Sequence, residues 1–342
     1  MKLIPILFFI LIAFSSFAQV DAGINVYTTK DTAASENIYY TNKTDKLVLK
    51  FTNSIKYTKL DITNVNDKQI LRLAPAGSLD LGFAFNYKWL GLGFTYGLPS
   101  GIHSDTTKGI TKRFDFQLSI YSKWFVIDGL YQKYRGFYLS NPSAFANWDS
   151  IAVFPQLPDM QNYSLGASAF YILNNKKFSY RAAYVRNVIQ NKSAGSILIG
   201  PFFNMDAAEN PNGFVPKEMP VAVQDSFDIN YFSSLSYGLA IGYTYSVVIV
   251  KKVFMNFSIV PGIGIKDLET RSTAGEQKIS KQGIAGRVNY RFAFGYEHRS
   301  FLIGLTFYGT QGSIKIDNLD ISPGAGMLNL FVGKRFDLKK KK

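Results

Sequence analysis

Residues 284–297 read IAGRVNYRFAFGYE, and in this stretch the side chains alternate between two kinds. One set holds the large apolar residues, from Ile284 through Val288 and Tyr290 to Tyr296, and the other holds Ala, Arg, Asn, Gly and Glu. A period of two predicts a β-strand with one apolar face and one polar face. The same alternation recurs at 79–87, 90–96, 114–120 and 235–245.

The N-terminus has the features of a secretion signal. Lys2 supplies a positive charge, Leu3 to Phe14 form a short apolar core, and Ser16-Phe17-Ala18 places small residues at a cleavage site. The apolar core is shorter than the roughly 20 residues that a membrane-spanning helix needs, which favours a signal peptide over an N-terminal anchor. We therefore expect the mature chain to start at Gln19. The chain has no cysteine, which excludes a lipid-anchored lipoprotein, disulfides and thiolate metal sites.

Many alternating strands behind an export signal predict an all-β fold, a transmembrane antiparallel β-barrel of the outer membrane. The competing folds are a soluble β-sandwich and a barrel with an internal cavity, whose wet exterior would be rich in Lys, Glu and Thr. Here the polar face often carries Gly, Ala and Ser, which suit a crowded lumen better. The expected organisation is a signal peptide at 1–18, a periplasmic lead segment at 19–45, the barrel at 46–338 and a basic tail at 339–342.

Connection lengths set the expected number of strands. Bacterial barrels have an even number of strands, short periplasmic turns and long external loops. Alternation of short and long connections gives about 12 strands, provided that 178–203 is one strand with a bulge at 192–195. Long loops are then expected at 98–112, 139–161, 204–232, 266–281 and between strands near 300–310 and 326–337.

The net charge of +14 gathers at the turns expected in the periplasm. These turns carry Lys88, Lys123, Lys176, Lys177, Lys251, Lys252 and Arg299. Such a distribution fits contact with phospholipid head groups of the inner leaflet, so outer-membrane lipids are the expected partners. Basic residues placed singly at turns of an exported chain argue against nucleic-acid binding. Trp89 and Trp124 each follow a turn lysine, where the aromatic girdle of a barrel is expected.

Three stretches carry a resemblance to a known family: Asp45-Lys46-Leu47, Tyr87-Lys88-Trp89-Leu90-Gly91-Leu92-Gly93 and Lys192-Ser193-Ala194-Gly195-Ser196. There the chain resembles the domain of unknown function 4421 family, an uncharacterised outer-membrane β-barrel family of the Bacteroidota. The resemblance extends over 40–338 and implies a barrel, but its motifs are structural and imply no catalytic residue. The closing strand, with Leu328, Leu330 and Val332 to Phe336, looks like a signal for the barrel assembly machinery, although Lys334 departs from the usual apolar pattern.

The sequence offers little catalytic or metal-binding chemistry. The chain has two histidines, and an enzyme of the outer-membrane lipase kind needs a serine activated by one of them. His103 lies beside Ser104 and Asp105 in a loop, but adjacent loop residues rarely reach the geometry of a triad, and His298 falls in a turn. Asp225 and Asp228 lack the dense spacing of a calcium loop. We therefore predict no enzymatic activity, no metal and no cofactor.

The polar face of the strands is the better place to seek function. Charged and amide side chains on inward phases are Asp80, Arg113, Asp115, Arg181, Arg287, Asn289 and Arg291. Arg113 and Asp115 predict a local ion pair. Arg287 and Arg291 share one face of one strand, and the expected neighbours Asn256, Ser258, Leu302, Gly304 and Thr306 include no carboxylate. Because an unpaired buried guanidinium is costly, their counter-charge must come from across the lumen, a folded-in segment or a passing anion.

Two functional classes follow from this pattern. The first is a passive, porin-like channel for small solutes, which requires a continuous wet path past Arg287 and Arg291. The second is a plugged barrel with a structural, surface-display or partner-binding role. A lumen filled by aromatic side chains or paired charges favours the second class.

Overall fold

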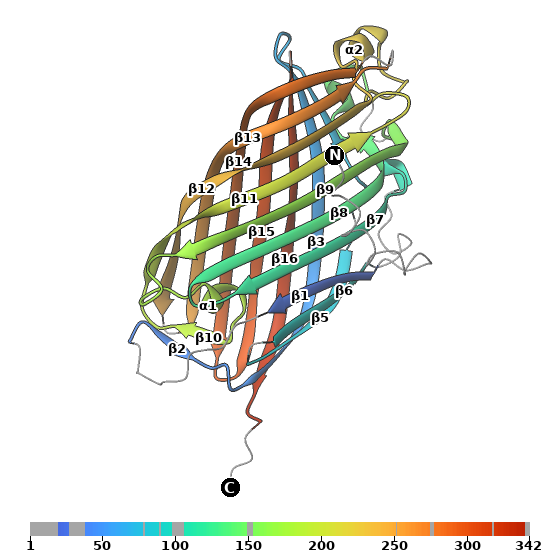
Figure 1. The fold of residues 1–342 in the computed structure, drawn as a ribbon. Coiled ribbons are helices and arrows are strands. Elements are labelled where there is room, and N and C mark those ends of the chain that lie inside the picture. The colour runs from blue at the N-terminus through green and yellow to red at the C-terminus, as the bar shows by residue number, and fades with distance from the viewer. Residues whose placement is uncertain are drawn as a thin grey trace, which may run out of the picture.

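A computed structural model of the chain describes residues 20–26, 38–77, 79–88, 90–97, 106–148, 153–250, 252–273, 277–316 and 318–338. Long tilted strands wind into a barrel, with helix α2 at one end and α1 at the other (Figure 1). The strands are β1 Val20–Val26, β2 Tyr40–Asn42, β3 Leu47–Asn64, β4 Ile70–Ala74, β5 Leu79–Tyr87, β6 Leu90–Gly97, β7 Lys112–Tyr121, β8 Phe125–Leu139, β9 Gln156–Ile172, β10 Val188–Gln190, β11 Ala194–Glu209, β12 Tyr231–Val250, β13 Val253–Arg271, β14 Gln277–His298, β15 Phe301–Ile316 and β16 Leu319–Phe336. The helices are α1 Tyr180–Tyr184 and α2 Val221–Ser226, with 3-10 turns at Thr106–Lys108 and Pro142–Ala144. None of the helices in these described ranges is long and apolar enough to cross a membrane.

A closed ring of ten antiparallel strands forms the barrel. The ring runs through β3, β4, β8, β9 and β11 to β16, and β16 returns to β3 along its whole length, from Leu319↔Asn64 to Phe336↔Leu47. The short strand β4 completes the ring, because Leu73 and Ala74 pair with the end of β8. Since every strand of a closed barrel has two neighbours, no long edge is left open. The predicted fold class is confirmed.

A second arc of strands also joins β3 to β8. It consists of β5, β6, β1 and β7 in that spatial order, and β1 is antiparallel to β6 but parallel to β7. The twelve strands expected from the sequence correspond to β3, β5 to β9 and β11 to β16. Residues 20–26 and 40–42, both in the expected lead segment, form β1 and β2, so residue 46 does not mark the start of β-structure.

Three local predictions were wrong, and one of them is the long loop expected at 266–281, because β13 extends to Arg271 and β14 begins at Gln277. Residues 178–203 are not one strand: α1 and β10 come first, and only β11 is part of the barrel wall. The alternating Phe178, Tyr180 and Ala182 mimic a strand, but all three are buried, because this segment folds into the barrel. The long loop expected between 310 and 326 is also absent from the described ranges, because β15 extends to Ile316 and β16 begins at Leu319.

Alternation along the strands separates an apolar outer face from a polar inner face. On β12 to β14, Leu239, Ile263 and Ile284 are 66%, 66% and 74% exposed, whereas the interleaved Thr244, Asn256 and Asn289 are buried. A soluble protein rarely exposes such a continuous apolar surface. The outward face therefore matches a lipid environment, and the polar face lines the interior.

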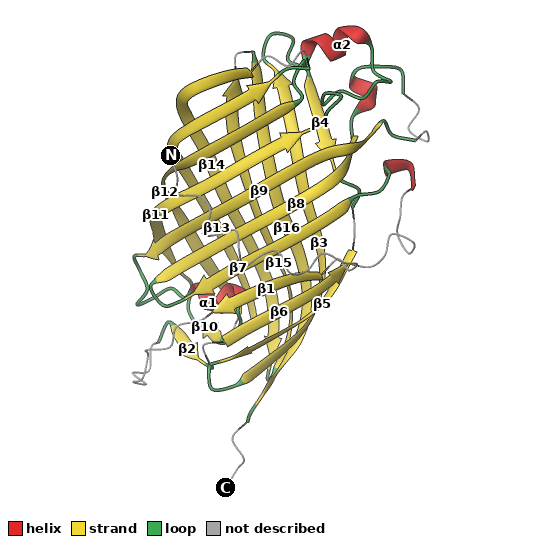
Figure 2. Ribbon diagram, turned by 45° about the vertical axis from the view of Figure 1, so that its right-hand side comes forward, coloured by secondary structure: helices red, strands yellow, loops and turns green. Residues whose placement is uncertain are grey.

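The two ends of the barrel differ in their connections. At the turn end, which we define by the connections at 88–89, 122–124, 251–252 and 299–300, successive strands are joined by two or three residues, and α1 lies at this end (Figure 2). At the opposite loop end, the longer connections at 140–155 and 210–230 include the second 3-10 turn and α2. The C-terminal strand ends at the turn end (Figure 1).

Candidate functional site

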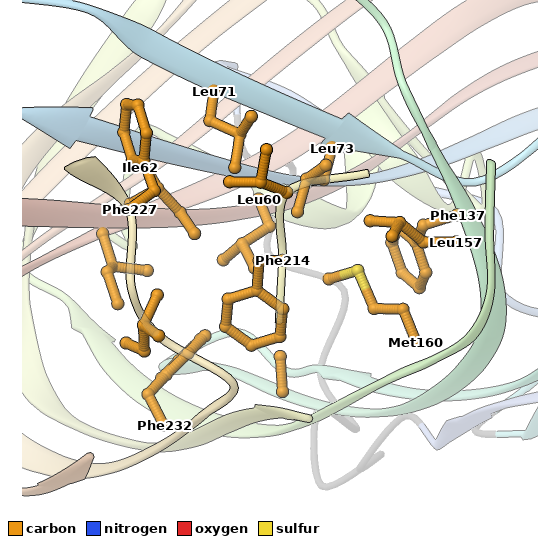
Figure 3. Close-up of a cluster of buried hydrophobic side chains, with 14 of the residues drawn as sticks. Leu60, Ile62, Leu71, Leu73, Phe137, Leu157, Met160, Phe214, Phe227 and Phe232 are labelled. Carbon is orange, nitrogen blue, oxygen red and sulfur yellow. The ribbon is translucent and has the colours of Figure 1, made fainter. Parts of the chain in front are cut away.

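The loop end is closed by an apolar cap, which we define as residues 210–230. Phe214 and Phe227 of the cap are almost completely buried against Leu60 and Ile62 of β3 (Figure 3). The same cluster takes buried side chains from strands all round the barrel: Leu71, Leu73, Leu139, Leu157, Met160, Phe232, Leu268, Ile314 and Ile321. Burial of one such side chain contributes about 1.5–3 kcal/mol. The cap is therefore a packed core that fills the mouth.

The middle of the lumen is crossed by an ion pair between Arg291 on β14 and Asp128 on β8. The Arg291 guanidinium also donates to the Tyr121 hydroxyl at 2.6 Å. Four phenol rings surround its carbon at 4.7–5.8 Å, from Tyr121, Tyr180, Tyr184 and Tyr308. Ring faces attract a cation. The charge of Arg291 is thus compensated on all sides by the protein.

Arg287 lies two inward positions before Arg291 on β14. Its guanidinium lies 3.8 Å from Asp206 on β11, and the Ser164 hydroxyl donates to the same Asp206 at 2.8 Å. Asp206 was expected in an external loop, but β11 continues to Glu209 and carries it inward. Asn289 is buried between the two arginines on the same face. The counter-charges of both arginines come from across the lumen, which is one of the three sources that the sequence left open.

The expected register placed the wrong β15 residue beside Arg291, with an error of one inward position. Arg291 pairs with Ser258 on β13 and with Tyr308 on β15, whereas Thr306 is opposite Ala293. The exact hairpin register between β14 and β15 depends on the turn geometry. The correction places a tyrosine ring, rather than a threonine, beside the guanidinium.

A second polar group lies on β5, β7 and β8. Arg113 forms an ion pair with Asp80, which also lies 3.5 Å from the Lys56 ammonium. Asp115 accepts hydrogen bonds from Gln132 and from the Tyr134 hydroxyl, both at 2.6 Å. The sequence predicted an ion pair of Arg113 with Asp115, whereas the structure shows Arg113 paired with Asp80 on a different strand. These charges are compensated within the wall.

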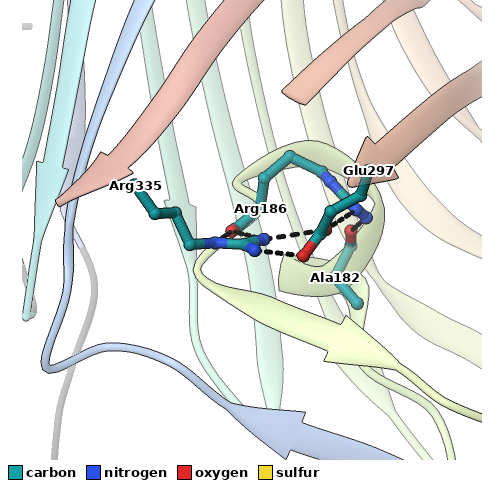
Figure 4. Close-up of polar contacts among 4 residues, drawn as sticks. All are labelled: Ala182, Arg186, Glu297 and Arg335. Atoms are coloured by element: carbon teal, nitrogen blue, oxygen red, sulfur yellow. Dashed lines mark hydrogen bonds and ion pairs between the residues drawn. The ribbon is translucent and has the colours of Figure 1, made fainter. Parts of the chain in front are cut away.

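The turn end is closed by a folded-in segment, which we call the plug and define as residues 178–191. Arg335 at the end of β16 forms an ion pair with Glu297 at the end of β14, with one contact at 2.9 Å (Figure 4). Arg335 also donates to the Arg186 carbonyl at 2.7 and 3.0 Å, and Arg186 forms an ion pair with Glu297. The Ala182 carbonyl accepts a hydrogen bond from Arg186. One carboxylate and two guanidinium groups thus fasten the plug to two strand ends.

Arg186 has a backbone conformation that usually belongs to glycine. Its φ of 72° lies in the left-handed region, and its N–H donates to the Arg181 carbonyl at 2.9 Å, which terminates α1. A non-glycine residue pays roughly 1–2 kcal/mol for this conformation. Burial lowers the pKa of Arg186 to about 10, while Glu297 opposes that shift, so the group remains charged at neutral pH.

Aromatic packing completes the plug. Tyr180 and Tyr184 stack at 4.9 Å, and Tyr121 of β7 stacks on both. The Tyr184 hydroxyl donates to Asn256 on β13 at 2.8 Å. Arg181, predicted on a strand, lies in α1, where its side chain donates to Asn187 at 3.3 Å. The plug therefore touches the ring of tyrosines around Arg291.

The remaining predicted residues have the following positions. Trp124 is exposed beside the turn after β7 and stacks on Tyr171 at 6.1 Å. Trp89 and His103 lie outside the described residues. His298 is exposed at the end of β14 and stacks on Tyr296. Asp228 accepts a hydrogen bond from the Thr273 backbone at 3.0 Å. In the described ranges, no group of three or more acidic or histidine side chains could hold a metal ion.

The sequence reasoning missed Asp128, Glu297 and Arg335 as members of the site. Each lies on the inward phase of its strand, so extending the alternation to the strand ends would have included them. The tyrosines of the plug gave no such signal, because their strand-like spacing hid a helix.

Comparison with known proteins gives one family match. The profile of the family described as "Domain of unknown function (DUF4421)" matches residues 29–336. Comparison with curated proteins gives no match.

The chain is also similar to solved structures. The outer membrane protease OmpT of Escherichia coli aligns with a TM-score of 0.35 and 8% identity, covering 86% of this chain and 98% of that chain. The translocator domain of the autotransporter NalP of Neisseria meningitidis aligns with a TM-score of 0.30 and 8% identity over 84% and 88% of the two chains. The toluene transporter TodX of P. putida aligns with a TM-score of 0.25 and 8% identity over 94% and 97%.

Proposed function

The chain belongs to the DUF4421 family of unknown function, and we propose that it is an outer-membrane β-barrel closed at both ends, with a structural or partner-binding role rather than a porin role. The observation that carries this proposal is the pair of closures: an apolar cap at the loop end and an ion-paired plug at the turn end. Between them, both arginines that would line a channel have protein carboxylates as partners.

The apolar outer face supports the membrane location. Exposed Leu, Ile, Phe and Tyr side chains cover the outside of the strands, and such a surface is stable in hydrocarbon but not in water. The exposed turn-end cations Lys88, Lys176, Lys177, Lys252 and Arg299 support a periplasmic position of that end, next to anionic lipid head groups. The loop end, with its cap, then faces the cell exterior. Outer-membrane lipids and the barrel assembly machinery are the partners of this proposal.

The proposed role uses the rigidity of the cap. Because Phe214 and Phe227 anchor the 210–230 segment in the barrel core, the outward residues Lys217, Glu218 and Val221 are presented on a fixed scaffold. Preorganised loops lose less conformational entropy when they bind a partner. The proposal assigns no catalytic role to the exposed His298 or to any other described side chain.

Liposome swelling tests the closure. Vesicles with wild-type protein should take up small sugars no faster than empty vesicles. A variant in which short Gly-Ser linkers replace both the plug at 178–191 and the cap at 210–230 should admit them, whereas either replacement alone should not, provided that heat-modifiable gel mobility shows a folded barrel. Replacement of the plug is feasible because β9 and β11 are already paired at Ile172↔Leu198. Rapid swelling with the wild type would reject the plugged barrel and restore the porin-like channel for small solutes.

A further inference from the structure

A cavity of about 210 Å³ lies in the lumen between the plug and the inner face of β3. Its β3 wall is a ladder of four polar side chains, Lys50, Thr52, Ser54 and Lys56. Tyr184 of the plug and Arg291 contribute the facing wall. The cavity is not fully enclosed. It therefore brings a plug residue and the mid-lumen arginine to one polar space.

Lys50 is the one described cation in this cavity that lacks an anionic partner. Its ammonium lies 3.3 Å from the Tyr184 carbonyl and 4.8 Å from the centre of the Phe331 ring, and the residue is only 9% exposed. No described carboxylate forms an ion pair with it. An ammonium has three N–H donors. One carbonyl and one ring do not satisfy all three donors and do not neutralise the positive charge. Buried charges normally have a partner of opposite sign.

The charge balance around the cavity confirms an excess of positive charge among the described residues. Asp128 is used by Arg291, and Asp80 is shared by Arg113 and Lys56. Asp115 accepts from the neutral Gln132 and Tyr134. At the turn-end side, Arg186 and Arg335 share Glu297 alone. The lining carboxylates Asp115 and Asp128 are held by other side chains, and among the described residues neither forms an ion pair with Lys50.

The remaining lining mixes polar side chains, among them Asp115, Asp128 and Gln117, with apolar ones. Phe307, Met327 and Leu130 contribute hydrocarbon surface, and Ala84, directly opposite Lys50 on β5, leaves the space open. A cavity of about 150 Å³ is large enough to hold benzene. The cavity here has room for a ring of that size and a charged substituent.

We propose that this cavity binds a small organic carboxylate, with its negative charge at Lys50 and its apolar body against Phe307, Met327 and Leu130. The Thr52 hydroxyl, next to Lys50 on the same face of β3, offers a further hydrogen-bond donor to the carboxylate, whereas the Ser54 hydroxyl already donates to Asn329 at 3.1 Å. This ligand site is independent of the external role of the cap.

Titration calorimetry of the purified full-length protein in detergent tests the site, with benzoate as the probe. The matched probes are benzamide, which lacks the charge, and inorganic phosphate, which lacks the apolar body. We expect benzoate to bind and the two matched probes to bind at least about tenfold more weakly, because a hydrogen bond to a charged group and the apolar contact are each worth about that factor. Equal binding of benzamide, tighter binding of phosphate, or no benzoate binding would overturn the proposal.

Two variants locate the probe. Lys50→Gln should weaken benzoate binding at least about tenfold by removal of the charge, and Ala84→Phe should abolish it by filling the cavity. Lys59→Gln is the matched control, because Lys59 is on the same strand but on the outer face, where it pairs with Asp61 at 2.9 Å. Heat-modifiable mobility confirms that each variant is folded. Benzoate binding that survives both cavity substitutions in folded protein would place the ligand elsewhere and contradict the proposal.

Discussion

Arg291 on β14 and Asp128 on β8 form an ion pair that spans the barrel lumen, although 163 positions separate them in the chain. They lie on the polar phases of two strands that are not neighbours in the sheet. The pair links opposite parts of the wall, and the tyrosines of β7, β15 and the plug enclose it.

This relationship predicts a strong dependence of stability on both partners. Arg291→Gln should destabilise the barrel by about 3–5 kcal/mol, because Asp128 is left as a buried charge, and Asp128→Asn should do the same. The double substitution should cost clearly less than the sum of the two. Denaturant titration in detergent measures the free energy of unfolding. The control is Arg135→Gln, which breaks an exposed pair with Asp159 and should cost at most about 1 kcal/mol. Additive effects at Arg291 and Asp128 would contradict the ion pair.

The cap predicts a protease phenotype at the loop end. Phe227→Ala should destabilise the cap by about 3–5 kcal/mol, because it removes a large side chain from a packed cluster. We expect faster cleavage within 210–230 by an added protease on intact cells. Val221→Ala in the same cap is the control, since Val221 is 70% exposed and its substitution should leave the cleavage rate unchanged. Equal cleavage of both variants would show that Phe227 does not anchor the cap.

The left-handed conformation of Arg186 predicts an unusual order of stability. Arg186→Ala removes the contacts to Glu297 and Ala182 and keeps the backbone strain, whereas Arg186→Gly removes the strain as well. The glycine variant should therefore be more stable than the alanine variant by roughly 1 kcal/mol, although both are less stable than the wild type. Thermal unfolding monitored by gel mobility measures the order. An alanine variant as stable as the glycine variant would argue against backbone strain at Arg186.

The orientation of the barrel predicts a labelling pattern. Glu218→Cys in the cap and Lys252→Cys in the turn after β12 are both at exposed positions, and the wild type has no cysteine. On intact cells an impermeant maleimide should label the first variant only, and after permeabilisation it should label both. Labelling of the second but not the first on intact cells would reverse the orientation.

Period-two alternation was enough to predict the barrel, because inward and outward side chains of a strand must differ when one face meets lipid. It also placed Arg287, Asn289 and Arg291 on one inner face, where they lie. The partner Asp206 was lost because β11 extends into a segment assigned to a loop. Cross-lumen partners depend on the curvature of the whole sheet, which no local pattern contains.

The plug could not be predicted for a different reason. Phe178, Tyr180, Ala182 and Tyr184 alternate as in a strand, and the helical conformation of Tyr180–Tyr184 is decided by burial in the lumen rather than by local propensity. The αL turn at Arg186 carries no glycine that would have marked the end of a helix. Tertiary packing has overridden the sequence signal at this point.

Single-channel recording in planar bilayers tests the closed lumen most directly. Wild-type protein should be nearly silent, because the cap, the Arg291–Asp128 pair and the plug block the path. Replacement of both Arg287 and Arg291 by Gln should destabilise the barrel, since Asp206 and Asp128 lose their counter-charges, while the cap and the plug keep the path closed. The control is again Arg135→Gln, which should stay silent. Steady, anion-preferring conductance of the wild type that falls in the double variant would contradict the account, because the two arginines would then line an open channel.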